Sequence, residues 1–436
     1  MKLVIKNILA HRRRNIWLFL ELVVVTIVTW IALDPVMILY SISTLSSGYD
    51  YEQLVYMETG VESSMSPYYS ESASSDEEMR KSFDMILSQI RNMPDVESVT
   101  PVSSWLRLET GSSMPLSLNY LDEQGDTVKY TTFMYGRPIE KDYFITYGIQ
   151  STDESPSPQE LSDMPMGKHD IIINESVARK MFGDGGNYIG RQTIDAGDGN
   201  SYRVVGVVKD VRPWHWRSLW RILWIDEQYT NSEPAVTSRG LIIRLKEGIS
   251  PTWWINKYKE QCLTDLKAGN LRITIAETNS DMSESTWQSR QAKNNRITNI
   301  GLFVFFMVNL ILGVAGTFYL QTRRRSHDAG IMKSFGATRR NVFNGLAVEA
   351  LIITFAGWVI GCLIYLHYAL KAGLSLGIDW DLADLPLNHW TSNFWEHFGI
   401  VSVAVLVVLA VIVLIGVSFP ARRIARVNPV DALRDE

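Results

Sequence analysis

The chain has 436 residues, of which 46% are hydrophobic, and a formal net charge of −5. It carries only two cysteines, so no disulfide framework is indicated. Residues 43–296 contain 26 Lys or Arg against 36 Asp or Glu, and the basic residues elsewhere cluster beside apolar runs. Because nucleic-acid binding needs an independent basic surface, this distribution argues against a nucleic-acid partner.

Four apolar runs divide the chain, and each exceeds the roughly 20 residues that cross a ~30 Å bilayer core. We therefore expect transmembrane helices at 15–42, 297–320, 342–370 and 398–419. The polar residues 43–296 between the first two runs are long enough for a folded domain with two α/β subdomains. The expected fold class is an α-helical membrane protein with four transmembrane helices and a large mixed α+β extracytoplasmic domain inserted between helices 1 and 2.

Basic residues fix the expected orientation. They are concentrated in the amphipathic N-terminal segment 1–14, the loop 321–341 and the C-terminal segment 420–436, whereas 371–397 is acidic. The positive-inside rule places the basic segments in the cytoplasm and 371–397 outside. A cleaved signal peptide is the competing interpretation of the N-terminus, but the run from Ile16 is long for one and has no clear cleavage site.

Within residues 43–296, local signals predict alternating helices and strands. Ser75 and Glu78 fit a capping box that begins a helix, and Pro94 ends it. Alternating apolar residues predict strands, and a longer apolar stripe predicts a helix at 253–266. The expected strands are 96–99, 104–108, 127–133, 168–173, 202–208, 241–245 and 271–276.

A tryptophan-rich stretch is the most unusual part of this domain. In a helix, Trp216, Trp220 and Trp224 would stack at i, i+4 and i+8, with Trp214 nearby. Such a surface could contact a ligand, a partner protein or the outer face of the bilayer, although a stripe of this kind is more often part of a core. Both interpretations stay open at this point.

Two groups of residues resemble a phosphate loop and a metal site, but neither has the residues or the spacing that such a site needs. The glycines at 185–190 lack the Lys and the Ser/Thr of a phosphate loop, so we expect no nucleotide hydrolysis by that mechanism and no enzyme activity in this chain. His367, His389 and His397 lie near the outer ends of the last two spans, but their spacing fits no recognised metal site. Loop or interface histidines are the commoner case, and we expect no metal.

The third expected span contains a charged residue and a glycine pattern that bear on helix packing or coupling. Glu349 is its only charge and is a candidate for packing or coupling, with Arg339 or Arg340 as nearby partners. Gly357 and Gly361 form a GxxxG pattern, which lets helices approach closely. Inside one chain this pattern would pack the helix on its neighbours.

The loop before that span combines basic and apolar residues. Ile331 and Phe335 lie one helical turn apart with Met332 beside them, giving a small apolar face suited to a protein groove. Gly336 can end this helix, and Thr338 can cap the next one.

Several segments together resemble MacB-like and FtsX-like ABC transporter permeases. The similarity covers RRRSHDAGIMKSFGAT at 323–338, Glu349 with Gly357 and Gly361, and PARRIARVNPVDALR at 420–434. IINESVARKMFG at 172–183 and YRVVGVVKDV at 202–211 are similar to signatures of the MacB-type periplasmic domain. His-Asp-Ala at 327–329 departs from the pattern of these permeases.

The resemblance implies a permease subunit in the bacterial inner membrane, with ATP and Mg on a separate ABC-type ATPase and no cofactor in this chain. It implies a dimer with a second copy or a related permease, mechanical transmission to the periplasmic domain, and export or extraction of a peptide, antimicrobial or lipoprotein. A periplasmic adaptor or an outer-membrane partner is a further candidate. Residues implied to contact the ATPase are Arg325, Asp328, Gly330, Ile331, Met332, Lys333, Phe335, Gly336, Ala337 and Thr338. An FtsX-like signalling subunit that regulates a cell-wall hydrolase is the alternative.

Overall fold

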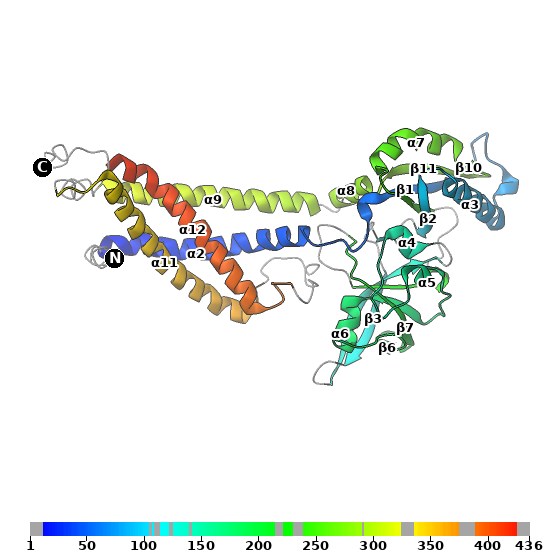
Figure 1. The fold of residues 1–436 in the computed structure, drawn as a ribbon, viewed down its shortest axis with the longest axis horizontal. Helices are drawn as coiled ribbons and strands as arrows, with labels where there is room; N and C mark the ends of the chain where they lie inside the picture. Colours follow the sequence, from blue (N-terminus) through cyan, green and yellow to red (C-terminus); the bar gives the residue numbers. More distant parts are fainter. Residues whose placement is uncertain are drawn as a thin grey trace. The chain divides into compact units, whose positions relative to one another are not determined.

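The structure is a computed structural model, and its chain divides into two compact units. It describes residues 12–103, 107–108, 114–121, 125–138, 142–213, 221–229, 239–289, 292–323, 335–374 and 389–424. The first unit comprises Met1–Ser41, Asn294–Trp380 and Asn388–Glu436, and is called the helical unit here. The second comprises Ile42–Lys293 with Asp381–Leu387, and its continuous part is called the inserted domain. Figure 1 shows the elements of each.

In its described residues, the helical unit has the long helices α2 (Arg12–Ser43), α9 (Ala292–Arg323), α11 (Arg339–Ala372) and α12 (Phe394–Ile424). Three described segments are long and apolar enough to cross a membrane, namely Ile16–Ile38, Arg339–Ala372 and Phe394–Ser418. In α9 the described apolar stretch is the shorter Ile300–Gly313. The structure thus supports three spans by length and composition, and a fourth span at α9 stays a prediction.

Helices α2, α11 and α12 pack around two apolar clusters. One joins Leu18 and Leu22 of α2 to Ile353 of α11 and Val413 of α12, and the other is centred on Trp30. The contact between α2 and α11 depends on Gly357 and Gly361. An added Cβ would lie 2.9 Å from Leu22 Cβ at Gly357 and 2.6 Å from Thr26 Cβ at Gly361. The GxxxG pattern therefore serves close packing within the chain.

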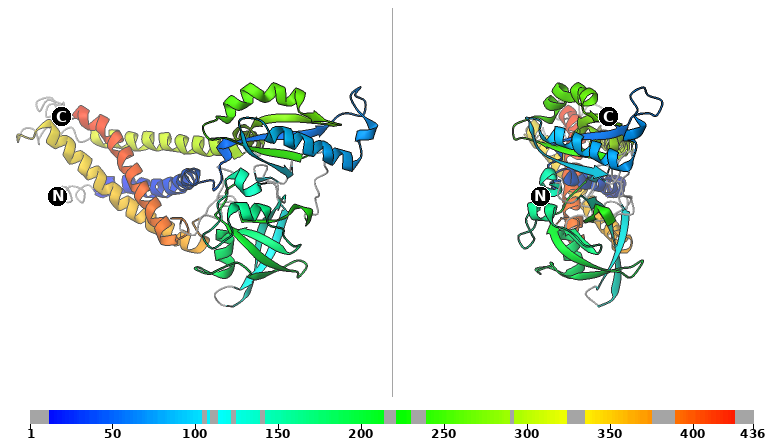
Figure 2. Two further views of the ribbon diagram at one scale, coloured as in Figure 1. Left: turned by 45° about the vertical axis from the view of Figure 1, so that its right-hand side comes forward. Right: turned by 90° about the vertical axis from the view of Figure 1, so that its right-hand side faces the viewer.

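The inserted domain consists of a five-stranded sheet and a closed six-stranded barrel, which are distinct lobes in Figure 2. The sheet has the order β10-β11-β1-β9-β2, and its neighbours are antiparallel. Its strands are β1 (Leu54–Val61), β2 (Val96–Ser103), β9 (Arg239–Leu245), β10 (Lys267–Ala268) and β11 (Leu271–Thr278).

Alternation along the strands divides the sheet into two buried faces. Val55 and Met57 of β1 pack with α3 (Asp76–Arg91) and α7 (Pro251–Asp265) in one core. Leu54 and Tyr56 point to the opposite face and join the core shared with the barrel lobe. This is the period of two expected for a strand, and it links both lobes into one compact unit.

The barrel closes in the order β3-β4-β8-β5-β7-β6. Its strands are β3 (Met114–Leu121), β4 (Thr127–Arg137), β5 (Asp170–Asn174), β6 (Gln192–Asp195), β7 (Ser201–Val208) and β8 (Ile222–Asp226). β4 pairs in parallel with β8, β5 pairs in parallel with β7, and Leu118 and Asn119 of β3 pair with β6 to close the ring. The short helices α4 (Tyr143–Tyr147), α5 (Pro158–Asp163) and α6 (Glu175–Phe182) pack on it, and α8 (Asn279–Ser289) follows the sheet.

Most local predictions agree with these elements. Ser75 caps α3 by accepting a hydrogen bond from the Glu78 backbone N–H, and Thr338 caps α11 through Asn341. The predicted strands at 127–133, 202–208 and 271–276 lie inside observed strands. Of the strand predicted at 104–108, residues 104–106 lie outside the described part, and the prediction is wrong at 107–108, which are not in a strand.

We expect Gly361→Val to weaken the helical unit by about 2 kcal/mol or more, because a Cβ there meets the α2 side chain Thr26 and lies 3.0 Å from the Val23 carbonyl oxygen. Thermal unfolding of the full chain in detergent would measure the loss. Gly345→Val is the matched control, since a Cβ at Gly345 on the same helix has open space around it. Equal losses for the two variants would contradict the packing argument.

Burial raises the pKa of the Cys262 thiol to about 12. A thiol with a raised pKa holds very little thiolate at neutral pH, and the thiolate is the nucleophile. We therefore expect a maleimide to label Cys262 only when the α7 face of the sheet opens. Labelling rates with and without denaturant, in a Cys362→Ala background, measure this. Rapid labelling of the folded chain would contradict it.

Candidate functional site

The site is the segment that follows α2 into the inserted domain, residues 44–50, called the junction here. Its backbone is held by two hydrogen bonds. The Arg212 N–H donates to the Ser47 carbonyl at 2.8 Å, and the Asp50 N–H donates to the Tyr147 carbonyl at 3.0 Å. Because one bond comes from the segment after β7 and the other from α4, the junction is fixed at two separate points.

Arg212 anchors the beginning of the junction. Its guanidinium is almost fully buried and donates to the Leu45 carbonyl. Burial lowers the pKa of Arg212, and the neighbouring Tyr51 and Tyr49 hydroxyls oppose that shift. Tyr49 adds a hydrogen bond of 3.1 Å from its hydroxyl to the Pro213 carbonyl. The turn after α2 is thus fastened to the segment that leaves the barrel.

Gly48 explains how the chain fits there. Its φ of +75° lies in the left-handed region, and an added Cβ would lie 2.0 Å from the Asp210 carbonyl oxygen. Only glycine allows this approach, because any side chain would strain the backbone and collide with the segment after β7.

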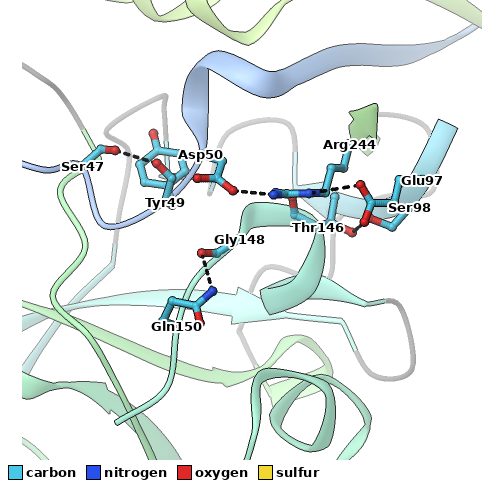
Figure 3. Close-up of polar contacts among 9 residues, drawn as sticks. All are labelled: Ser47, Tyr49, Asp50, Glu97, Ser98, Thr146, Gly148, Gln150 and Arg244. Carbon is cyan, nitrogen blue, oxygen red and sulfur yellow. Dashed lines mark hydrogen bonds and ion pairs between the residues drawn. The ribbon is translucent and has the colours of Figure 1, made fainter. Parts of the chain in front are cut away.

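Arg244 of β9 connects the end of the junction to the sheet and to α4, as Figure 3 shows. Its guanidinium donates to the Asp50 carboxylate and to the Thr146 carbonyl, the latter at 3.2 Å. Its Nε lies 3.6 Å from a carboxylate oxygen of Glu97 on β2. One planar cation therefore binds three separate elements, which a Lys ammonium cannot reproduce with the same geometry.

Two contacts beside Arg244 tighten the same region. Thr146 of α4 donates to the Ser98 hydroxyl of β2 at 3.0 Å. Gly148, with φ +71°, lets α4 end against the junction, since a Cβ would lie 2.4 Å from the Asp50 carboxylate. A displacement of the junction therefore has to move Arg212, Arg244 and α4 with it or break these hydrogen bonds.

No group of three or more His, Cys, Asp or Glu residues that could hold a metal ion occurs in the described part of the chain.

The predicted coupling loop is described only at its end. Arg325, Asp328, Gly330, Ile331, Met332 and Lys333 lie outside the described residues. Phe335 is 88% exposed, and Gly336 has φ +88°, a conformation suited to ending a helix. Ala337 packs beside Val342 at the start of α11. The role of this loop stays a prediction.

Glu349 is buried on α11, and Gly357 and Gly361 lie against α2.

For the tryptophan stretch, the helical interpretation is wrong at Trp224. Trp224 lies in β8, is fully buried, and donates from Nε1 to the Tyr143 hydroxyl at 3.3 Å. Its ring packs edge to face on Phe144, so this indole fills the core and is not an outer-face contact. Trp214, Trp216 and Trp220 lie outside the described residues.

Sequence reasoning did not find the junction. Gly48, Asp50, Gly148, Arg212 and Arg244 come from separate parts of the chain, and no spacing rule connects them. One signal was available, because the similarity at 202–211 ends directly before Arg212.

Residues 36–252 match the family described as the MacB-like periplasmic core domain, and residues 300–429 match the FtsX-like permease C-terminal family. A domain inserted between apolar helices, with these two matches in this order, defines an ABC transporter permease. More particularly, the chain belongs to the MacB-like and FtsX-like permeases.

Curated relatives include the macrolide export ATP-binding/permease protein MacB of Escherichia coli (strain K12). The identity is 23% over 366 residues, covering 80% of this chain and 48% of that protein. MacB of Neisseria meningitidis serogroup A is 23% identical over 329 residues, covering 72% and 46%. The chain spans about half the length of the curated relatives it matches.

Two solved structures are also similar. The periplasmic region of MacB from Actinobacillus actinomycetemcomitans has 12% identity and a TM-score of 0.30, covering 56% of this chain and 97% of that one. The extracellular domain of the noncanonic ABC-type transporter YknZ from Gram-positive bacteria has 13% identity and a TM-score of 0.28, covering 50% and 100%.

We expect Arg244→Ala to lower the stability of the inserted domain by about 1–2 kcal/mol, because it leaves Asp50 and the Thr146 carbonyl without their donor. Chemical unfolding followed by tryptophan fluorescence would measure the change. Arg203→Ala is the control: its ion pair with Asp170 is formed by an arginine side chain that is 57% exposed, so its loss should stay below about 1 kcal/mol. A larger effect at Arg203 would contradict the role given to Arg244.

Proposed function

We propose that the chain is the permease subunit of an ABC transporter in the bacterial inner membrane, driven by a separate ATPase subunit that holds ATP and Mg. ATP-driven movement of the helices would pass through the junction to the inserted domain. The observation that carries the proposal is the fastening of residues 44–50 to both lobes by Arg212 and Arg244. A loosely attached linker would absorb such movement, whereas this one transfers it.

The proposed topology has four spans, with α9 as the second, both termini in the cytoplasm and the inserted domain outside. The basic loop 321–341 then faces the ATPase. The exposure of Phe335 supports this assignment, because an apolar ring that is 88% exposed at a basic, water-facing loop is suited to a protein partner.

We propose that the transporter exports or extracts a substrate held on the outer side, such as a peptide, an antimicrobial or a lipoprotein. The relatives of this chain are named macrolide export proteins, which supports the antimicrobial class. Two permease copies, or this chain with a related permease, would form the transporter, with a periplasmic adaptor or an outer-membrane protein as a further partner. The FtsX-like signalling alternative is not favoured, since the relatives named here are export proteins.

Purification in mild detergent, followed by mass spectrometry of the retained proteins, tests the proposal directly. Retention of an ABC-type ATPase, together with ATPase activity that depends on this chain, is the expected result. Purification of the folded chain with its other partner proteins but without any ATPase would overturn the proposal.

For the coupling loop, we expect the double variant Ile331→Asp and Phe335→Asp to abolish most of the ATPase stimulation while the chain stays folded, because two carboxylates cannot enter an apolar groove without losing their hydration. ATP hydrolysis by the reconstituted complex measures this. Leu121→Asp is the matched control, as Leu121 is an apolar side chain on β3 that is 67% exposed. Unchanged stimulation in the double variant would show that the basic residues act only as a membrane-orienting anchor.

A further inference from the structure

An acid–base pair is buried where α2 meets the first turn of α12. His397 Nε2 and Asp34 Oδ1 are 2.6 Å apart, and the side chains are 5% and 4% exposed. Asp34 directly precedes Pro35, which lies inside α2 and removes one backbone donor from the helix. The pair therefore ties α12 to α2 at a point where α2 is already weakened.

Aromatic rings enclose the pair. The Trp30 ring lies 4.2 Å from the ring of Tyr365 and 6.2 Å from that of His397, measured between centroids. Trp390 meets His397 edge to face at 5.1 Å. The Trp30 Nε1 donates to the Ser402 hydroxyl of α12 at 3.2 Å, which holds this ring in place. Because the rings exclude water, a change of charge inside the cluster is poorly screened.

A second histidine, His389, contacts α2 nearer to its C-terminal end, at Ser41. His389 Nε2 lies 2.6 Å from the Ser41 hydroxyl, and its Nδ1 lies 2.7 Å from the Thr391 hydroxyl. The Trp390 Nε1 donates to the same Ser41 hydroxyl at 3.0 Å. Asp34 and Ser41 are two helical turns apart, so the segment from His389 to His397 contacts one face of α2 at two points.

Few other titratable groups face this cluster. Tyr365 of α11 interacts electrostatically with Asp34, and His389 interacts with His397. The Glu396 side chain on α12 is exposed, and Ile300–Gly313 of α9, whose Phe303 packs here, contains no titratable residue. Within the described residues, therefore, two histidines, one aspartate and one tyrosine set the charge.

Protonation decides whether this arrangement is stable. Asp34 and His397 together are neutral when they share one proton, in either form of the pair. A second proton leaves a net positive charge among aromatic rings, where an ion without a counter-ion is destabilised by the loss of its hydration.

The environment of His389 leads to the same pH dependence. Burial lowers the pKa of His389, and the nearby His397 lowers it further. A group with a depressed pKa in the closed state binds its proton more readily when the cluster opens. The closed state is thus fully favoured above the ordinary histidine value of 6.5 and loses that advantage as the pH falls below it.

We propose that Asp34, His397 and His389 form an acid-released latch that clips the last turns of α2 to the start of α12. At neutral pH the latch holds the end of α2, the helix that continues into the junction. Acidification charges the cluster and frees that end. The latch is a property of the helical unit itself, so it does not depend on the proposed ATPase or substrate.

Distance measurement between spin labels tests the latch in the full chain. With Cys262 and Cys362 replaced by alanine, labels are attached at Tyr40→Cys on α2 and Trp395→Cys on α12, whose native side chains are 70% and 63% exposed. Between about pH 7.5 and about pH 5, on either side of the ordinary histidine pKa, we expect the distance peak seen at neutral pH to lose most of its population to a longer one. An unchanged distance in folded protein overturns the proposal.

Two variants separate titration from simple structural support. Asp34→Asn with His397→Gln keeps a neutral hydrogen-bonding pair, so the distance should stay short at both pH values. His389→Gln leaves the Asp34–His397 pair intact and removes one of the groups that become cations on acidification. The transition should therefore move to lower pH, and this test holds even if the double variant fails to fold. His367→Gln, an exposed histidine on α11, should behave like the parent chain. A transition that persists unchanged in the His389 variant would assign the pH response elsewhere and overturn the latch.

Discussion

The inserted domain depends on one planar cation, the guanidinium of Arg244. Its donors reach Asp50, Thr146 and the vicinity of Glu97, which belong to the junction, to α4 and to β2. Around it the apolar core shared by sheet and barrel keeps the lobes together, but apolar contacts are non-directional and allow sliding. The guanidinium of Arg244 adds hydrogen bonds, which are directional. Together with Arg212 it fastens the entering chain to both lobes, which is the basis of the proposed mechanical role of the junction.

Much of the fold was accessible from sequence because its determinants are local. Ser75 and Thr338 were recognised as caps from spacing alone, and the structure confirms both. Strand periodicity and apolar run length are likewise written in adjacent residues. The GxxxG pattern of α11 was also readable, although only the structure identifies α2 as the helix it meets. The expected mixed α+β character of the inserted domain is confirmed, whereas the count of four spans stays a prediction at α9.

What the sequence could not supply are contacts between distant segments. Asp34 and His397 are 363 residues apart, and Asp50 and Arg244 are 194 apart, so no local pattern connects either pair. From its neighbours alone, His397 was interpreted as a loop or interface residue. At Trp224 the helical spacing was wrong, because the residue lies in a strand, and of the two interpretations left open the core one holds there.

The closure of the barrel has a consequence for how the inserted domain meets other chains. In the described ring each of the six strands pairs on both sides, and the closing pair of β3 with β6 is formed at Leu118 and Asn119, so backbone addition of an extended polypeptide to that lobe is disfavoured. The sheet lobe does have edges, at β2 and at β10, but β10 is two residues long and Pro101 interrupts the donors of β2. β10 pairs only with Leu271 and Arg272, so the rest of β11 keeps an open edge. Backbone addition of an extended chain is therefore directed to the sheet lobe, whereas chains that contact the barrel lobe are recognised mainly through side chains.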